Sequence, residues 1–396
     1  MTSAGGIAAC AVAMYGMIQL DVFGLSDAER QRRTSTSTTT TSSGSSNGTM
    51  KMDGPSGFPN PEGNGEDGVA GHSVIRIKGQ DGVDQVDTGT STVPYFPSTI
   101  RLPKSTSLDS DTGLLNAGDE VPRDAEQDEY QLLGLGIRTV SFLRIQVYVV
   151  GLYVATPDIA ELQTRLVRTA LNPPSSSSSS SSSSESGSGG NYATSLVPGE
   201  RQQLKDLLLD AGENSDAAWD TILKKDGLRT AFRIVPTRNT DFLHLRDGWV
   251  RGITGRAQRA NITTTTTGVG AGNGADAGAG ANKDGGRSEF SDDSFGTALN
   301  SFKGLFGGGQ RKSVPKGQTL ILLRGARGEL DALFQPEEKL PARWLGRVRD
   351  ERVSRLVWLN YLAGKNVASE GARKSVVDGV MAIVERPVGT IVQKVV

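Results

Sequence analysis

Three tracts rich in Ser, Thr, Gly and Ala interrupt the chain and limit how much of it can enter a folded core. They cover residues 34–71, 173–190 and 260–286, and the second holds an unbroken run of serines from Ser175 to Ser184. Such segments bury too little apolar surface to offset the entropy of ordering them. We therefore predict a disordered spacer at 26–71 and disordered surface insertions at 173–190 and 260–286, all within or beside one substantial domain at 72–396.

Residues 1–25 form a segment of a different kind, because they are largely apolar. Asp21 is the first charge in this segment, and Arg30, Arg32 and Arg33 follow it. An uncharged run of about 16 to 20 residues is at the short end for a membrane-spanning helix, and it also resembles the core of a signal peptide that lacks its preceding basic residues. We predict a membrane anchor here, with a targeting segment or a start without structural meaning as the alternatives.

Charge and cysteine content argue against several classes of protein. The chain has 43 Lys+Arg against 44 Asp+Glu, so it lacks the basic excess that nucleic-acid phosphates favour. With Cys10 as the single cysteine and His72 and His244 as the histidines, neither a disulfide framework nor a four-ligand Cys/His zinc site can form. We expect no nucleic-acid partner and no metal site built from side chains alone.

The strongest strand signal lies at 132–155, which is too long for one strand and predicts a hairpin turning near Leu143 and Arg144. Successive side chains of a strand alternate between faces. Two glycines beside an arginine would leave a hollow on the face that they share. The residues predicted to share this face are Gly134, Gly136, Arg138, Val140 and Phe142.

The remaining pattern predicts a mixture of strands and helices, with the helices concentrated late in the chain. This order indicates an α+β domain and not a βαβ repeat. Thr240 or Asp241 is expected to cap the helix that carries Phe242, Leu245, Trp249 and Ile253. The other predicted helices cover 158–167, 204–208, 219–223, 342–362 and a segment from Ser369 to Val384, and the other predicted strands cover 228–235 and 319–323.

Four segments, taken together and in order, resemble the chalcone isomerase family, with the greatest similarity to its fungal mitochondrial branch. The resemblance implies an open-faced β-sandwich in which helices cover a large antiparallel sheet and a ligand cleft lies between them. The four segments are TGTSTVP from Thr88 through to Phe96-Pro97, LGIRTVSFL from Leu135 with VYVVGLY from Val147, RIVPTR from Arg233 with Phe242 to Gly248, and YLAG from Tyr361 with Val367-Ala368-Ser369.

The resemblance also implies a set of site residues. Plant members close a ring in a chalcone, and an arginine holds the anion while tyrosine, threonine and asparagine groups organise water. Arg138 matches the arginine, and a guanidinium suits an oxyanion because it is always charged and presents forked donors. By this resemblance Arg138, Tyr148 and Tyr361 are the catalytic candidates, and the ligand-binding set adds Gly134, Gly136, Phe242 and Trp249.

Several of these positions depart from the plant pattern, which leaves three functions open. Tyr148 stands at a threonine position, Phe242 replaces a tyrosine that donates a hydrogen bond, and Trp249 lies at or near an asparagine. We expect a non-catalytic protein that binds an amphipathic anion, as fatty-acid-binding relatives do, with a chalcone-type intramolecular lyase or a scaffold with a vestigial cleft as alternatives. A flavonoid-like ligand would suit the lyase.

The resemblance implies no required cofactor, but haem is a possible ligand. Arg138 would suit its propionates, and His244 or a tyrosine would be the iron ligand. The family likeness and the apolar N-terminal segment together indicate a mitochondrial protein at the inner membrane. For each site residue an ordinary structural role stays open, namely an ion pair for Arg138, core packing for Tyr148, Phe242 and Trp249, and a surface position for His244.

Overall fold

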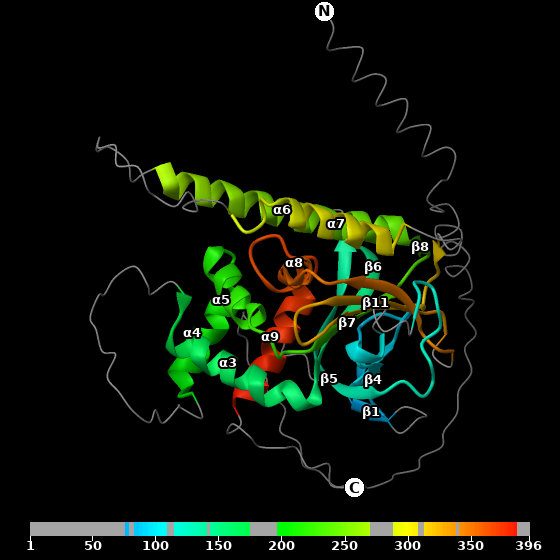
Figure 1. Ribbon diagram of the computed structural model, residues 1–396. Helices are drawn as coiled ribbons and strands as arrows, with labels where there is room; N and C mark the ends of the chain where they lie inside the picture. Colours follow the sequence, from blue (N-terminus) through cyan, green and yellow to red (C-terminus); the bar gives the residue numbers. More distant parts are fainter. Residues whose placement is uncertain are drawn as a thin grey trace, which may run out of the picture. The chain divides into compact units, whose positions relative to one another are not determined.

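A seven-stranded antiparallel sheet forms the centre of the computed structural model, which describes residues 76–78, 83–108, 115–140, 143–174, 196–269, 288–307, 313–337 and 340–385 (Figure 1). Its strands lie in the order β12-β11-β10-β7-β6-β5-β4. Their bounds are β4 Thr99–Pro103, β5 Gln127–Val140, β6 Ile145–Ala155, β7 Thr230–Pro236, β10 Thr319–Arg324, β11 Leu330–Gln335 and β12 Arg343–Val348.

Both faces of this sheet are buried, which explains why its central strands are apolar almost throughout. In β6, Tyr148 and Val150 enter the core on one face, while Val149 and Tyr153 enter a second core on the other face. This alternation follows from the period of two in a strand. A small sheet adjoins the second core and consists of β1 Arg76–Lys78, β2 Asp84–Asp87 and β3 Tyr95–Pro97. Two short 3-10 helices follow strands of the large sheet: η1 Ser105–Leu108 follows β4, and η3 Thr156–Asp158 follows β6.

Helices cover the other face of the sheet. All of the described helices contribute buried side chains to the core that contains Tyr148, and α9 packs along β5. In Figure 1, α6 and α7 run side by side along one end of this helical layer. The bounds are α3 Ile159–Leu171, α4 Pro198–Leu209, α5 Glu213–Lys224, α6 Phe242–Val269, α7 Asp293–Leu305, α8 Glu351–Leu362 and α9 Glu370–Val384.

This architecture confirms the predicted α+β class with a helix-covered antiparallel sheet. The predicted hairpin is also confirmed, because β5 and β6 pair across a turn at Leu143 and Arg144, where Arg144 has φ of +50°. The predicted cap at Asp241 forms as well, since its carboxylate accepts a hydrogen bond from the His244 N–H at 2.6 Å. At Ser369, where a helix was predicted to begin, the hydroxyl caps α9 by accepting a hydrogen bond from Ala372 N–H at 3.2 Å.

One predicted helix is wrong in its first part. Residues 343–348 form strand β12, not the beginning of a helix over 342–362, and helix α8 begins only at Glu351. Gly346 has φ of +130°, a value that a right-handed helix cannot contain, and alternate residues of the segment are buried against β11. Asp350 then caps α8 by accepting a hydrogen bond from Arg352 N–H.

Two further differences concern the low-complexity tracts. Helix α6 continues to Val269, so residues 260–269 are helical where the sequence predicted an insertion. Helix α7 follows that tract and was not predicted. The predicted segments 1–25 and 26–71, the serine run, residues 270–286 and the hairpin residue Phe142 lie outside the described residues.

Candidate functional site

Arg138 and Tyr148 form a cross-strand pair at the end of the β5–β6 hairpin. Side chains opposite each other on antiparallel strands lie on the same face and interact. The Arg138 guanidinium carbon lies 6.0 Å from the centre of the Tyr148 ring, and its Nη1 donates a hydrogen bond of 2.9 Å to the carbonyl oxygen of Ala368. Arg138 is half-buried, so its charge is partly withdrawn from water.

Tyr148 is the first member of a buried polar chain that joins three elements. Its hydroxyl oxygen lies 2.7 Å from the hydroxyl oxygen of Tyr361 on α8. The indole Nε1–H of Trp249 on α6 donates to the Tyr361 hydroxyl at 2.8 Å. The structure therefore brings together Arg138, Tyr148, Trp249 and Tyr361, which the sequence had proposed as site residues.

The hydrogen bonds among Trp249, Tyr361 and Tyr148 leave one donor proton without an acceptor. The Trp249 N–H occupies the Tyr361 oxygen, and the Tyr148–Tyr361 contact uses one of the two hydroxyl protons. No acceptor for the other hydroxyl proton occurs among the described residues. Either hydroxyl can donate in the Tyr148–Tyr361 contact, and donation from Tyr361 to Tyr148 places the excess proton on Tyr148, beside Arg138.

Both tyrosines stay neutral at ordinary pH. Burial raises the pKa of Tyr148 well above its usual value, repulsion from an ionised Tyr361 adds to this rise, and Arg138 opposes it in part. Burial likewise raises the pKa of Tyr361, although the hydrogen bonds from Trp249 and with Tyr148 oppose the rise. Both groups therefore act as hydrogen-bond donors and not as bases near neutrality.

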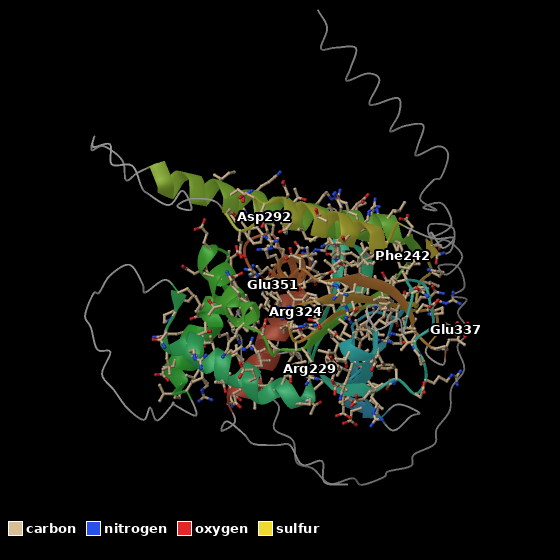
Figure 2. The ribbon with its side chains drawn as sticks, in the orientation of Figure 1. Arg229, Phe242, Asp292, Arg324, Glu337 and Glu351 are labelled. Atoms are coloured by element: carbon tan, nitrogen blue, oxygen red, sulfur yellow. The ribbon has the colours of Figure 1, made fainter. Side chains whose placement is uncertain are left out.

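The charge of Arg138 has no carboxylate partner within the part of the chain that the structure describes. This contrasts with Arg229, which is labelled in Figure 2. Its side chain bonds Asp158 at 2.8 Å and also contacts Asp128. An arginine withdrawn from water is usually paired with an acidic group, because desolvation of the charge is costly. Arg138 and the excess hydroxyl proton therefore form a donor set that suits an anion.

The two glycines of the predicted hollow serve a different purpose. A Cβ at Gly134 would lie 2.4 Å from the backbone of Ser375, and a Cβ at Gly136 would lie 2.3 Å from the backbone nitrogen of Ala372. The glycines thus let α9 approach β5 closely. The prediction of a hollow here is wrong, because the helix fills it, and these glycines position α9 and line no open space.

Aromatic rings fill the space beyond Trp249. Phe242, whose place at the start of α6 is labelled in Figure 2, packs edge-on against Phe334 at 5.2 Å between ring centres. Phe302 and Phe306, at the end of α7, lie 6.4 Å and 5.4 Å from the Trp249 ring. All of these rings are buried, so Phe242 is a packing residue in this state, and an open cleft beside it is not observed.

His244 does not join the site. It is exposed on α6, whereas Phe242, Leu245 and Trp249 of the same helix are buried. Both tyrosine hydroxyls are already engaged with each other. The described residues around Arg138 therefore offer no fitting ligand to a haem iron, and no group of three or more His, Cys, Asp or Glu side chains suited to a metal ion occurs within the described ranges.

Phe302, Phe306 and the Ala368 carbonyl are the parts of the site that sequence reasoning missed. A signal for the phenylalanines exists, because Asp292 is a good helix N-cap and Phe295, Ala298 and Phe302 follow at helical spacing. The role of the Ala368 carbonyl could not be predicted from the residue type, because every residue has a backbone carbonyl.

Fold and site together define an α+β protein in which helices close over one face of an antiparallel sheet and an arginine–tyrosine–tryptophan chain lies between the two layers. The profile of the proteins described as "Chalcone isomerase like" matches residues 128–377, and the chain belongs to this family. This confirms the family that the four sequence segments indicated.

The similar proteins include several from fungi. A protein of Debaryomyces hansenii named "Altered inheritance of mitochondria protein 18, mitochondrial" is 26% identical over 293 residues, which cover 74% of this chain and 74% of that protein. A protein of the same name from Eremothecium gossypii is 27% identical over 258 residues, which cover 65% of this chain and 68% of that protein. Another from Kluyveromyces lactis is 25% identical over 298 residues, which cover 75% of this chain and 79% of that protein.

Among solved structures, the crystal structure of an Arabidopsis thaliana fatty-acid binding protein matches with a TM-score of 0.43 and 16% identity, and the match covers 76% of this chain and 98% of that one. None of the helices in the described segments combines the length and the apolar character that crossing a membrane requires.

Proposed function

We propose that this protein binds an amphipathic carboxylate, with a fatty acid as the leading candidate, and that it does not catalyse a reaction on this ligand. The observation that carries the proposal is the donor set at the hairpin end, where the Arg138 guanidinium has no acidic partner among the described residues and the Tyr148–Tyr361 pair holds one excess proton. A carboxylate offers two oxygens that accept from both donors.

The same chain of residues suggests how the rest of the ligand lies. From Arg138 the polar contacts run through Tyr148 and Tyr361 to Trp249, and the rings of Phe302 and Phe306 pack against Trp249. A ligand with a carboxylate at Arg138 would direct its hydrocarbon chain toward the aromatic residues. Haem fits less well, because its propionates suit Arg138 but its iron lacks a fitting ligand.

The lyase alternative receives no specific support from the geometry. Phe242 cannot donate a hydrogen bond to a ketone, and it is buried among Phe306 and Phe334. The Trp249 N–H, the donor at the asparagine position, is already used by Tyr361. A scaffold role is the outcome that remains if no ligand binds.

Binding of a fatty acid to the full chain, compared with its Arg138→Ala and Arg138→Lys variants, tests the proposal. We expect oleate to bind the wild-type protein and Arg138→Ala to weaken that binding by tenfold to a hundredfold, since a charge-assisted hydrogen bond contributes about 1.5–3 kcal/mol. Arg238→Ala is the matched control, because Arg238 is exposed.

Three results would favour another function. Conversion of a chalcone to a flavanone that depends on Arg138 would favour the lyase. Co-purification of haem, seen by absorbance and mass spectrometry, would identify haem as the ligand. Equal or absent oleate binding in wild type and Arg138→Ala, with no conversion, would leave the scaffold.

We also propose a mitochondrial location at the inner membrane, with residues 1–25 as the membrane anchor. The names of the fungal relatives and the apolar character of this segment support the proposal. Carbonate extraction of mitochondria tests it: the full chain should stay with the membranes, and a chain without residues 1–25 should be released.

A further inference from the structure

Helix α7 covers the aromatic end of the proposed ligand site and presents a single apolar row to the rest of the protein. Phe295, Ala298 and Phe302 of α7 and Phe306 directly after it are buried, while most of its other residues are exposed. Phe302 and Phe306 end this row against Trp249. They occupy the space toward which the hydrocarbon chain of a ligand bound at Arg138 would extend.

The other helices around the site cannot yield this space without disrupting the core. Helix α8 buries nine of its residues, including Tyr361 itself. Helix α9 is fixed by close backbone approach, since a Cβ at Gly379 would lie 1.8 Å from the Leu133 carbonyl oxygen. Helix α6 carries Phe242 and Trp249 and also buries Leu245, Ile253 and Ala257. Helix α7 therefore buries the fewest residues of the four covering helices, and although it contacts β12, its displacement would leave the strand pairing intact.

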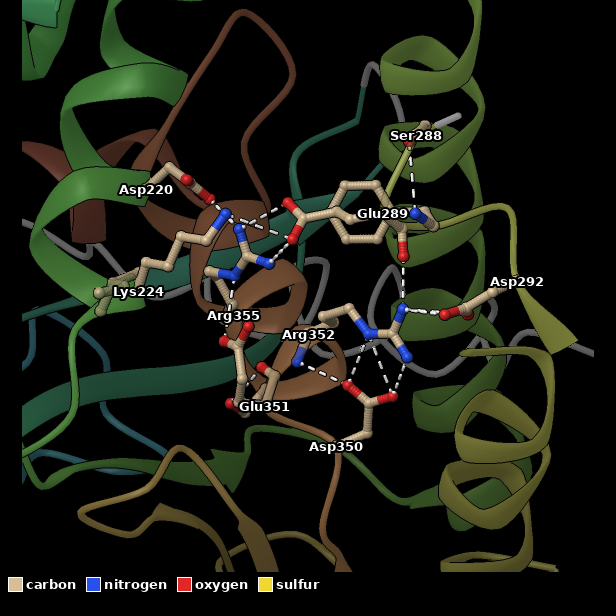
Figure 3. Close-up of polar contacts among 12 residues, drawn as sticks. Asp220, Lys224, Ser288, Glu289, Asp292, Asp350, Glu351, Arg352 and Arg355 are labelled. Carbon is tan, nitrogen blue, oxygen red and sulfur yellow. Dashed lines mark hydrogen bonds and ion pairs between the residues drawn. The ribbon is translucent and has the colours of Figure 1, made fainter. Parts of the chain in front are cut away.

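Ion pairs, and not apolar packing alone, hold the N-terminal end of α7 on α8 (Figure 3). The Glu289 carboxylate lies 2.9 Å from Arg355 Nη2, and the Asp292 carboxylate lies 2.9 Å from Arg352 Nη1. Arg352 also donates to the Ser294 hydroxyl at 2.7 Å. We call the pairs of Glu289 with Arg355 and of Asp292 with Arg352 the α7 latch.

The two sides of the α7 latch differ in a way that favours reversible opening. The acidic side chains are the more exposed partners, with Glu289 38% and Asp292 54% exposed. On α8, Arg355 is 0% and Arg352 is 16% exposed. When the acidic side leaves, Arg352 keeps Asp350 at 2.6 Å and Arg355 keeps Glu351 at 3.1 Å. Opening would therefore not leave a buried charge without a partner, which is the costly outcome for ion pairs.

We propose that α7 is the gate of the Arg138 site, that Phe302 and Phe306 fill the place of the ligand's hydrocarbon chain when the gate is closed, and that the α7 latch sets how often it opens. This inference rests on the proposed function. A ligand that binds only the open state associates at a rate proportional to the population of that state.

The test compares ligand association and amide hydrogen exchange in the full chain and its Glu289→Gln/Asp292→Asn variant. Both replacements keep the shape of the side chain and one acceptor oxygen while removing the charge, and Asn is as good an N-cap as Asp. We expect the association rate of the fluorescent fatty acid cis-parinaric acid to rise about two- to thirtyfold, because the variant removes two ion pairs that each contribute about 0.2–1 kcal/mol. Amides of α7 should also exchange faster.

Asp378→Asn is the matched control, because it removes an ion pair of 2.9 Å with Lys205 that joins α9 to α4 and does not involve α7. Phe306→Leu is a second variant that opens space without changing the latch, and it should bind the probe faster as well. The control should leave both the association rate and the exchange of α7 unchanged.

The possible failures differ from one another. If the wild type binds the probe through Arg138 and the latch variant changes neither the association rate nor the exchange of α7, the gate is wrong and the proposed function stands. If no variant binds the probe, the proposed function and the gate both fail, and faster exchange of α7 would then report only a loosened helix.

Discussion

The hydroxyl oxygens of Tyr148 and Tyr361 lie 2.7 Å apart, although 213 positions separate the two residues in the chain. This contact joins the central sheet to helix α8 in the middle of the core. It also makes the two tyrosines unequal, because Tyr361 alone accepts the hydrogen bond from Trp249 at 2.8 Å.

Replacement of each tyrosine by phenylalanine should separate stability from binding. Tyr361→Phe leaves the Trp249 N–H and the Tyr148 hydroxyl without a partner, and we expect a loss of about 2–4 kcal/mol in the free energy of unfolding. Tyr148→Phe removes one contact and should cost about 1 kcal/mol, but it should weaken oleate binding about tenfold. Urea unfolding and ligand titration measure the two effects, and equal effects of both variants would contradict the proton count.

Alkaline titration should show that the buried tyrosines do not ionise in the folded protein. Burial raises the pKa of Tyr130, Tyr148, Tyr153 and Tyr361 above the usual value of 10.0. The unfolded chain releases these protons first, so the contribution of these tyrosines to the free energy of unfolding is constant below about pH 10 and falls as the pH rises above it. Ultraviolet absorbance of tyrosinate against pH checks this prediction, and ionisation of all 7 tyrosines near pH 10 without unfolding would refute it.

Gly136→Ala should strongly destabilise the fold. The new Cβ would lie 2.3 Å from the backbone nitrogen of Ala372, so α9 would have to move away from β5. We expect a loss of about 3 kcal/mol or more in the free energy of unfolding, at the upper end for overpacking. Gly371→Ala is the control within α9, because its Cβ would meet no atom within 4 Å, and it should be neutral or slightly stabilising.

Arg324 should be essential for stability, although it ends a buried strand whose other residues are mostly apolar. It is 1% exposed and donates to the carbonyl oxygens of Leu223 and Leu228 at 2.8 Å and 3.3 Å, and its interior position is labelled in Figure 2. Burial lowers its pKa to about 10. Arg324→Met should cost about 3 kcal/mol, because it removes the buried donor to these carbonyl oxygens and to the Ser354 hydroxyl oxygen. The exposed Arg327→Met should cost little in the same thermal or urea unfolding experiment.

The elements that the sequence predicted well are those whose burial pattern repeats at a local period. The hairpin of β5 and β6 and the buried face of α9 are examples, since alternation or helical spacing marks them directly. Residues 343–348 were wrongly assigned to a helix, because over so short a segment their apolar residues fit both the spacing of a helix and the alternation of a strand. Pairing with β11 makes the segment a strand.

The site shows the same division. Sequence motifs identified Arg138, Tyr148, Trp249 and Tyr361, and the structure brings them into one connected chain. The role of Gly134 and Gly136 could not be found in this way, because a glycine in a strand signals close approach without showing whether a ligand or a helix approaches.

By itself, the sequence determined the family, the α+β class and the identity of the polar residues at the hairpin end, because motifs and periodicity are properties of neighbouring positions. Only the tertiary structure decided that α9 fills the hollow beside Arg138, that Tyr361 shares its oxygen between Tyr148 and Trp249, and that Phe302 and Phe306 close the aromatic end. These relationships join residues that are distant in the chain, so they depend on packing between layers that no local pattern encodes.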